Sequence, residues 1–383
     1  MKRRFKFKIS GESPRSLLLA FVLSKFECDI YLYNFLRDSN SNEDYQILSF
    51  SNFSKNLFNK FDTWKELKDF SYGVTSLHIK DNLVSDQLLL RNGNCCKKEY
   101  ASTIGWIINY SNIKSLLINK LINVDNVHFI SKNQKHNESL IFDYEFNFYS
   151  HEKFLSLFKL PLSISKRIDN QVLIFDVFLR GNVEKRLYEI NTARGLIILT
   201  PFHKNLYQVI WKNASFRIKE TSRNSKSFFV DNLTTLLPNE LIIDQIIGDI
   251  NYLHSSKTFS CYLVKNKSFY INENKSNSNI IYDFNFDIVI RNILKIYNFI
   301  EKKESSKIKI LNKLGFNYFY RKCLELFLNY SFSNFLFSLF TLNNIFSLII
   351  RKLLFSFIKR TNLLNTLFMR NPSNLNINNL IKL

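Results

Sequence analysis

The first thirty or so residues constrain the fold most, because they follow the order strand, turn, helix, strand. Residues 5–34 read FKFKISGESPRSLLLAFVLSKFECDIYLYN. The pattern predicts three elements: a strand at Phe5–Ser10, a helix at Leu17–Phe26 and a strand at Asp29–Tyr33. This order is typical of the first unit of a doubly wound parallel sheet, whose opening turn receives the phosphates of a dinucleotide. The turn needs three glycines, and the chain has Gly11, with Ser13 and Ser16 at the other two positions.

The composition indicates a folded chain with a large core. Of 383 residues, 46% are hydrophobic and 38 are Phe, which is enough for two packed domains or one large α/β domain and excludes disorder as the general state. Glycine is scarce, because 8 residues are about 2% of the chain against a usual share of about 7%. The chain therefore has few positions at which its backbone can closely approach a phosphate.

The formal charge of +21 suggests an anionic partner or a compositional bias. Nucleic-acid binding favours basic residues gathered on one face with interleaved aromatic residues. Here the basic residues are scattered, with short groups at Met1–Lys8, Lys302–Lys309 and Arg351–Lys359. We therefore expect no nucleic-acid partner, and an anionic membrane surface and a bias towards Asn, Lys, Ile and Phe remain as explanations.

Cysteine and histidine spacing predicts no metal site. The five cysteines are an odd number, and the adjacent pair Cys95 and Cys96 suits neither a zinc knuckle nor an ordinary disulfide. The six histidines show no metal-ligand spacing. Met1–Lys8 is basic but runs directly into a strand, so we expect no signal peptide and a reducing, cytoplasmic location.

The remainder of the chain alternates between helical and extended patterns, and its middle is rich in strands. The patterns predict helices at Ser54–Phe70, at Ser111–Leu121 with Ser111 as its cap, and around Glu240–Tyr252, with an irregular region at Leu83–Lys98. Strands are expected at Val74–Lys80, Ser102–Ile108, Gln171–Arg180, Gly195–Thr200, Leu206–Lys212 and Lys267–Ile271. A β-rich middle after a dinucleotide-type half indicates a second domain that faces a substrate.

The apolar segment Phe335–Ile358 has three interpretations. A transmembrane helix would place Asn343 and Asn344 at mid-depth, where unpaired amides are costly. The pattern therefore favours a buried helical hairpin that breaks near Asn343–Asn344. A peripheral amphipathic anchor, with cationic residues at the lipid surface, stays open; these residues are Arg351, Lys352, Lys359 and Arg360.

Five stretches resemble the flavin-dependent aromatic-ring hydroxylases of ubiquinone biosynthesis, the UbiH type with a para-hydroxybenzoate hydroxylase-like fold. They run over roughly residues 5–370, and TARGLIILTPFHKNLYQVIW, with Gly195, Pro201 and Trp211, is the most specific of them. The others are ISGESPRSLLLAFVLSKF, ILSFSNFSKNLFNKFDTWKEL with VTSLHIKD, YASTIGWIINYSNIKSLLINKL, and YINENKS with IIYDFNFDIVIRNIL.

The resemblance implies an α/β fold in three parts. Residues 1–165 and 255–305 would form a discontinuous Rossmann-like FAD-binding domain, residues 166–254 an inserted β-sheet substrate domain, and residues 306–383 a helical C-terminal region. It implies FAD as cofactor and NAD(P)H as electron donor, with Gly11, Pro14, Glu273 and Asn285 as cofactor-binding residues. It assigns no catalytic side chain. Expected partners are a polyprenylated phenol or quinone precursor, an anionic inner-membrane surface, and partner proteins of a biosynthetic complex.

The cofactor motifs depart from the family pattern. Serines replace two glycines of the first turn, Asn34 stands where an acid would hold the ribose, and Asn272 and Glu273 replace a Gly-Asp pair. Phe146 and Asn147 stand where the family has Asp-Gly. Two hypotheses follow. The chain is a divergent FAD-dependent monooxygenase, or it is a non-catalytic homologue that has lost FAD and serves as a binding or scaffold subunit.

Overall fold

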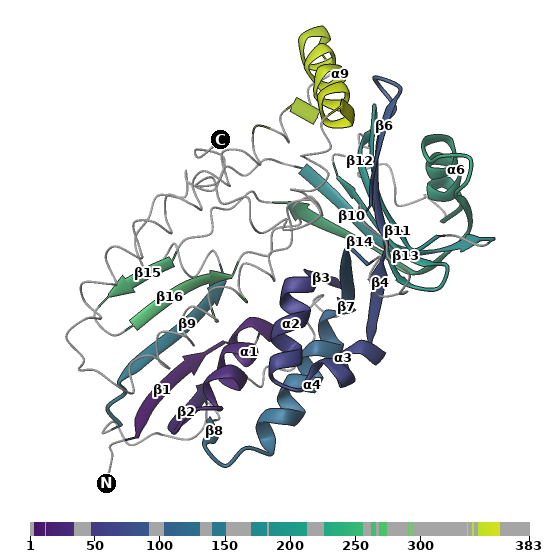
Figure 1. The fold of residues 1–383 in the computed structure, drawn as a ribbon. Coiled ribbons are helices and arrows are strands. Elements are labelled where there is room, and N and C mark those ends of the chain that lie inside the picture. The colour runs from purple at the N-terminus through teal and green to yellow at the C-terminus, as the bar shows by residue number, and fades with distance from the viewer. Residues whose placement is uncertain are drawn as a thin grey trace.

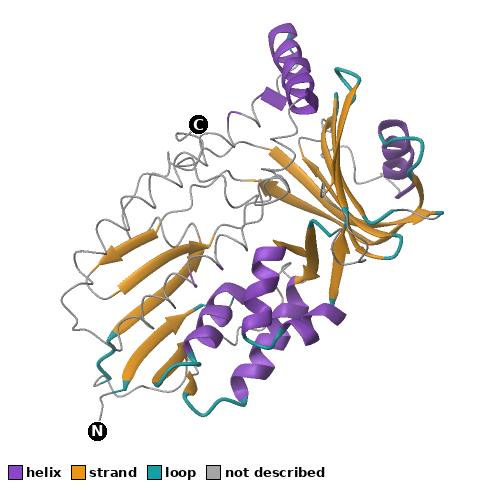
Figure 2. Cartoon of the chain, in the orientation of Figure 1, coloured by secondary structure: helices purple, strands orange, loops and turns teal. Residues whose placement is uncertain are grey.

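The computed structural model describes residues 4–11, 13–33, 47–91, 103–130, 140–150, 170–181, 184–212, 226–255, 262–265, 268–273 and 344–360, with single positions at 290, 293, 335, 339 and 340. Within these residues the chain forms a parallel-type sheet with its helices and a larger, mainly antiparallel sheet (Figure 1). The helices α1 to α4 gather along one side of the first sheet (Figure 2). The predicted α/β class, with a Rossmann-like sheet and an added antiparallel sheet, is confirmed.

The first sheet has six strands in the order β15-β16-β9-β1-β2-β8. All neighbours pair in parallel except β15 and β16, which are antiparallel. The strands are β1 (Phe5–Ser10), β2 (Cys28–Tyr33), β8 (Val127–Ile130), β9 (Tyr144–Ser150), β15 (Tyr262–Lys265) and β16 (Ser268–Glu273). The chain runs from β1 to β2 on one side, whereas β9 lies on the other side of β1, so the strand order reverses at β1.

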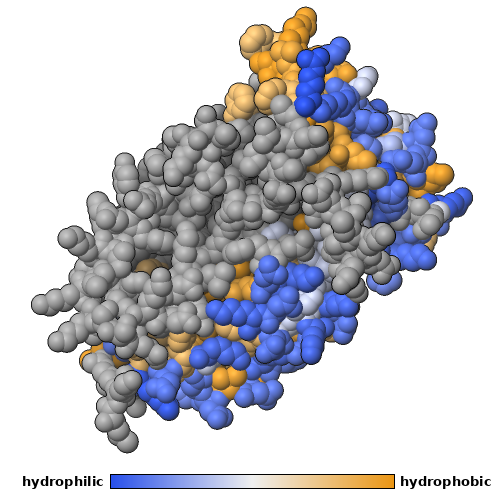
Figure 3. All heavy atoms as spheres, in the orientation of Figure 1, coloured by the Kyte–Doolittle hydropathy of each residue, from blue (hydrophilic) through white to orange (hydrophobic). Residues whose placement is uncertain are grey.

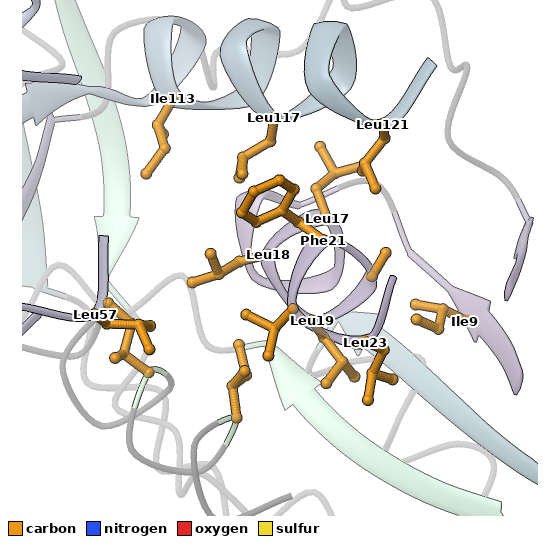
Figure 4. Close-up of a cluster of buried hydrophobic side chains, with 14 of the residues drawn as sticks. Ile9, Leu17, Leu18, Leu19, Phe21, Leu23, Leu57, Ile113, Leu117 and Leu121 are labelled. Carbon is orange, nitrogen blue, oxygen red and sulfur yellow. The ribbon is translucent and has the colours of Figure 1, made fainter. Parts of the chain in front are cut away.

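Helix α1 (Pro14–Leu23) is the centre of the first core. Its sequence PRSLLLAFVL is apolar on all sides from Leu17 onward, and every residue from Ser16 to Leu23 is buried. One side faces β1, and the other faces α4 (Tyr110–Ile122), where three residues at four-residue spacing lie against Leu17 and Phe21 (Figure 4); these are Ile113, Leu117 and Leu121. Helices α2 (Asn52–Lys60) and α3 (Trp64–Asp69) complete this core.

The second sheet has seven strands in the order β14-β10-β13-β12-β11-β5-β6. Its strands are β5 (Ser76–Asp81), β6 (Asp86–Arg91), β10 (Asn170–Arg180), β11 (Arg186–Thr192), β12 (Gly195–His203), β13 (Leu206–Lys212) and β14 (Ile242–Ser255). Only β5 and β11 pair in parallel in this sheet. Because β5 and β6 come from the first quarter of the chain, the early and middle segments share one sheet. The predicted boundary at residues 165 and 166 stays a prediction.

The two faces of the seven-stranded sheet have different covers. Helix α6 (Lys226–Leu236) packs on one face through Phe229 and Leu233. The opposite face, called here the inner face, packs against Val74 and Ile107 of a three-stranded sheet and against Phe355 of α9 (Ile345–Arg360). The three-stranded sheet consists of β3 (Ile47–Ser51), β7 (Gly105–Asn109) and β4 (Ser71–Val74).

Three local predictions were wrong. The segment expected to be helical at Glu240–Tyr252 is β14, because it pairs along most of its length with β10. The region expected to be irregular at Leu83–Lys98 contains β6, which completes the edge beyond β5. Helix α4 starts at Tyr110 after Asn109, so Ser111 lies inside its first turn and is not its cap.

The C-terminal helix α9 begins where the sequence predicts a break. The Asn344 side chain accepts a hydrogen bond from the Ser347 N–H at 2.8 Å, which caps the helix. The expected burial of this segment is wrong for one side of α9, which exposes five large apolar residues by 53% to 78%; they are Ile345, Phe346, Ile349, Leu353 and Phe357. No helix in the described residues is long and apolar enough to span a membrane.

The other side of α9 is anchored by a buried ion pair. Arg351 and Asp81 are both fully buried, and Arg351 Nη1 lies 3.3 Å from Asp81 Oδ2. Asp81 also accepts from the Leu83 N–H at 2.9 Å and from Asn191 Nδ2 at 3.0 Å. Arg351 Nε donates to the Leu339 carbonyl at 2.8 Å. These contacts satisfy the two buried charges and fix α9 to the end of β5.

Candidate functional site

Gly11 sits at the reversal point of the parallel sheet, directly after β1. Its backbone has φ +153°, and a Cβ at this position would lie 2.7 Å from the Phe148 Cβ of β9 and 3.2 Å from the Ser16 Cβ. Its N–H donates to the Tyr33 carbonyl at the end of β2 at 3.3 Å. The turn thus brings the ends of β1, β2 and β9 together, and only glycine fits at its first position. Ligands of such sheets bind at the carboxyl ends of strands where the order reverses.

The two serines of the turn fit the fold for separate reasons. Ser13 is the N-cap of α1 in an extended conformation that any residue adopts, and its Oγ accepts from the Ser16 N–H at 3.3 Å. Ser16 is completely buried beside Gly11, and its hydroxyl donates to the Ser13 carbonyl at 2.8 Å. The helix can therefore approach the strand without a third glycine, because the Ser16 hydroxyl bonds to the backbone of its own turn.

The N-terminus of α1 is a reduced phosphate cradle. Pro14 at the first helical position has no N–H, and the Ser16 N–H is taken by the Ser13 hydroxyl. Leu17 donates to the Ser13 carbonyl at 3.1 Å. Arg15, at the second helical position, is one of the first residues of the helix, whose N–H groups have no acceptor within the helix. A pyrophosphate at this end of α1 would meet the Arg15 N–H, the Ser13 hydroxyl and the positive end of the helix dipole. The residues present therefore fit a dinucleotide, with fewer donors than a glycine turn offers.

The structure places three of the four predicted cofactor residues at one edge of the sheet. Gly11 and Pro14 lie in the turn after β1, and Glu273 is the last residue of β16. Ser10 pairs with Asn147 and Asn147 with Tyr270, so Glu273 lies three residues further along the same edge. The Glu273 side chain and the whole of Asn285 lie outside what the structure describes. Their role as cofactor-binding residues stays a prediction.

A second group of polar residues lies on the inner face of the seven-stranded sheet, and the sequence analysis missed it. Cross-strand pairing places Asp176 opposite Gln208, and Gln208 opposite Thr200. Glu189 on β11 is opposite Ile198 on β12, one step along the same face. Gln208, Thr200 and Glu189 are all buried. These side chains are polar, yet they stand on a face that also carries the apolar core residues Leu196, Ile198 and Ile210.

Burial changes the proton affinity of two carboxyl groups on this face. Loss of solvent raises the pKa of Glu189 to about 7, and the nearby Lys212 ammonium opposes part of this rise. Burial also raises the pKa of Asp176, which the Gln208 side chain opposes by donating to it at 3.4 Å. In the described residues, Glu189 Oε2 and Thr200 Oγ1 are buried without a hydrogen-bond partner. Such unpartnered atoms are costly in a native fold.

A signal for these residues is present in the sequence but is weak. The strand RLYEINT carries one acid between Tyr188 and Ile190, and all of its residues after Arg186 are buried. A strand buried on both faces has no alternating pattern, so β11 itself was not predicted. The inward direction of Glu189 follows only from the pairing of β11 with β12 and β5. Strand β5 is distant in the chain, and the register between β11 and β12 was not predicted.

Comparisons with known proteins show the fold. No protein-family model matches the chain, and no curated protein matches it. Among solved structures, PqsL from Pseudomonas aeruginosa, described as a probable FAD-dependent monooxygenase, has a TM-score of 0.64 at 10% identity and covers 88% of this chain and 97% of its own. The p-nitrophenol 4-monooxygenase PnpA from Pseudomonas putida has a TM-score of 0.63 at 10% identity, covering 100% and 97%. The fold is that of FAD-dependent monooxygenases.

The same fold includes halogenating enzymes. The tryptophan halogenase from Shewanella frigidimarina has a TM-score of 0.55 at 11% identity and covers 84% of this chain and 75% of its own. The likeness thus extends over nearly the whole chain, at an identity that shows the fold alone. In the present chain this fold combines the turn at Gly11 with the polar inner face of the second sheet.

Proposed function

We propose that the chain is an FAD-dependent monooxygenase that hydroxylates a phenol. The observation that carries this proposal is the Gly11 turn, which is retained at the reversal point of the parallel sheet. The fold of the chain around this turn is that of FAD-dependent monooxygenases. Bound flavin, reduced by NAD(P)H, would supply the activation of oxygen. The protein supplies binding, orientation and a water-poor environment for the ring.

The residues of the α1 turn would hold the cofactor. Gly11 lets the chain reverse closely against β9, and the Arg15 N–H and Ser13 hydroxyl face a pyrophosphate at the helix N-terminus. Glu273, at the end of β16, and Asn285, after it in sequence, would make the second set of contacts. With the Ser16 N–H already bonded to Ser13, we expect weaker FAD binding than a turn with three glycines gives.

Flavin binding tests this proposal and separates the two hypotheses from the sequence. The purified protein is incubated with excess FAD, passed through gel filtration and measured by visible absorption. A flavin spectrum that elutes with the protein supports the monooxygenase. Elution of colourless protein contradicts it and favours the non-catalytic homologue.

We further propose that the substrate is a polyprenylated phenol of ubiquinone biosynthesis and that the protein works at an anionic membrane surface. The supporting observation is the outer side of α9, where five exposed apolar residues lie on a helix that also exposes Lys352 and Arg360 (Figure 3). The helix carries no acidic residue, so its charge is complementary to anionic lipid. Partner proteins of a biosynthetic complex remain an expectation.

Vesicle binding tests the membrane proposal. The double substitution Ile349→Ser and Leu353→Ser removes apolar area from the exposed side, and should greatly reduce cosedimentation with phosphatidylglycerol vesicles while leaving the fold intact. The matched control Ile122→Ser changes an exposed apolar residue of α4, which is 61% exposed. Equal binding of all three proteins would contradict the proposal, as would equal binding to phosphatidylcholine vesicles.

A further inference from the structure

The face of the seven-stranded sheet that α6 covers holds a buried histidine. His78 lies on β5 directly opposite Tyr188 of β11, and only 8% of its surface is exposed. The two rings are in contact, with their centroids 5.6 Å apart. Neither the turn at Gly11 nor the inner face contains this side chain. It places a group that titrates near neutral pH beside an otherwise largely apolar core.

A hydrogen bond to Gln87 fixes which ring nitrogen carries the proton. His78 Nε2 lies 3.2 Å from Gln87 Oε1 on β6. That oxygen can only accept, so Nε2 donates and Nδ1 keeps a lone pair in the neutral ring. Nδ1 is buried without a hydrogen-bond partner in the described residues, and Glu240 Oε1 lies 3.8 Å from it. Two acceptors therefore face each other while the ring is neutral, and a proton on Nδ1 converts them into an ion pair.

Glu240 belongs to a turn that is already attached to the β5–β6 hairpin at another point. The turn, at residues 238–241, joins α6 to β14. Just before it, the Leu236 carbonyl accepts a hydrogen bond from Asn82 Nδ2, in the turn after β5, at 2.9 Å. The Glu240 side chain is 51% exposed, so it can move between water and the ring. The first attachment joins two neutral groups and does not titrate, whereas the second depends on the protonation of His78.

We propose that His78 is a proton-operated clasp that holds the turn at 238–241 against the β5–β6 hairpin. In acid, Nδ1 takes a proton from solvent, and the resulting N–H donates to the Glu240 carboxylate and draws the turn towards β5. When the pH rises, the proton returns to solvent and Glu240 moves back into water. The bond from Asn82 to Leu236 persists in both states, so the clasp changes how firmly the connection between α6 and β14 is held.

The surroundings of the ring keep the clasp open at neutral pH. Burial lowers the pKa of His78, and the Arg186 guanidinium on β11 and the Lys80 ammonium on β5 lower it further. Arg186 is itself paired with Glu184 at 2.5 Å, and the Tyr188 phenol stays neutral because burial raises its pKa to about 12. The clasp therefore closes only below pH 6.5, the ordinary pKa of histidine.

Two groups favour the proton on His78, and one of them can be removed without disturbing the buried ring. The Gln87 hydrogen bond raises the pKa of His78, and so does the Glu240 carboxylate. Gln87 touches the ring in both states, whereas Glu240 is exposed and carries the charge that changes the balance. Glu240→Gln should therefore lower the pKa of His78, and Lys80→Gln, which removes an opposing charge, should raise it.

NMR titration of the full-length protein with isotope-labelled histidine measures these shifts. Contacts with the Tyr188 ring assign the His78 signal. Its midpoint should lie below 6.5 in wild type, fall in Glu240→Gln and rise in Lys80→Gln. The control Glu27→Gln removes the charge of an exposed glutamate from the segment between α1 and β2, and should leave the midpoint unchanged.

Hydrogen exchange in peptides that span residues 237–243 measures the turn itself. One pH unit below the His78 midpoint, exchange in Glu240→Gln should be roughly two- to fivefold faster than in wild type, the effect expected of a partly exposed ion pair. One unit above the midpoint, the two proteins should exchange equally. Asn82→Ala should speed exchange at both pH values, because its bond to Leu236 does not titrate.

The outcomes decide the proposal without reference to the cofactor, since every measurement uses the protein without flavin. A lower midpoint in Glu240→Gln, with faster exchange of the turn only below the midpoint, supports the clasp. An unchanged midpoint in Glu240→Gln overturns it. Equal exchange of the turn in Glu240→Gln and wild type below the midpoint overturns it as well, because the ion pair then holds nothing in place.

Discussion

Replacing Arg351 with Met should destabilise the protein more than any exposed charge substitution does. The guanidinium is fully buried and contacts the Asp81 carboxylate at 3.3 Å and the Leu339 carbonyl at 2.8 Å. Met has a similar chain length but no charge, so Asp81 would keep the Leu83 N–H and Asn191 and lose its counter-ion. Removal of one partner from a buried pair costs about 3–5 kcal/mol. We expect a loss of this size in the free energy of unfolding.

The assay is urea unfolding followed by circular dichroism, with Lys359→Met as the matched control. Lys359 also lies on α9 and pairs with Asp86 of β6, the strand next to β5. Because the Lys359 side chain is 46% exposed, loss of this ion pair should cost less than about 1 kcal/mol in the free energy of unfolding. A double-mutant cycle with Asp81→Asn should show coupling, because the second substitution removes a charge that the first left unpaired. Equal costs for Arg351→Met and Lys359→Met, or additive costs in the cycle, would refute the anchoring of α9 by this pair.

Two further changes follow from the same structure. Gly11→Ala should lower the free energy of unfolding by about 1–3 kcal/mol, because its Cβ would lie 2.7 Å from the Phe148 Cβ at a φ of +153°. The control Gly248→Ala, at φ +67° with open space around it, should cost less in the same denaturant titration, and a smaller effect at Gly11 would contradict the account. Glu189 has a native pKa of about 7 against an ordinary 4.5, so between these values the native state holds a proton that the unfolded chain has released. Stability should therefore fall as pH rises from 5 to 8, by about 3 kcal/mol from this group, and Glu189→Gln should remove that fall; an unchanged profile would refute it.

Local sequence predicts the elements whose structure is decided locally. The β1–α1–β2 unit was predicted because its turn, its apolar run and its strands are contiguous in the chain, and the structure confirms both strands and the helix, which begins at Pro14 rather than Leu17. Ser13 fits because it caps α1, a role that short hydroxyl side chains take readily.

The errors come from contacts between distant segments. The segment of β14 has apolar residues at spacings that suit a helix as well as a strand, and its pairing with β10, about seventy residues earlier, decides for the strand. Strand β6 is stabilised by β5 across a short turn and by α9 from the far end of the chain. No local pattern contains that information.

The candidate site divides in the same way. The Gly11 turn was found from its own residues, whereas Glu189 and Thr200 come together only because β11 and β12 pair in one register. A one-residue slip would turn Glu189 to the α6 side of the sheet. Their shared lack of a partner is a property of the folded chain and has no counterpart in the sequence.

The most direct test of the account is the visible absorption spectrum of the full-length protein after incubation with FAD and gel filtration. If the α1 turn holds the cofactor, flavin absorption elutes with the protein. The substitution Gly11→Ala, which disturbs the turn, should then reduce the amount of flavin that elutes with it. If the protein elutes without flavin at any FAD concentration tested, the chain has the fold of a monooxygenase without its cofactor, and the central claim is wrong.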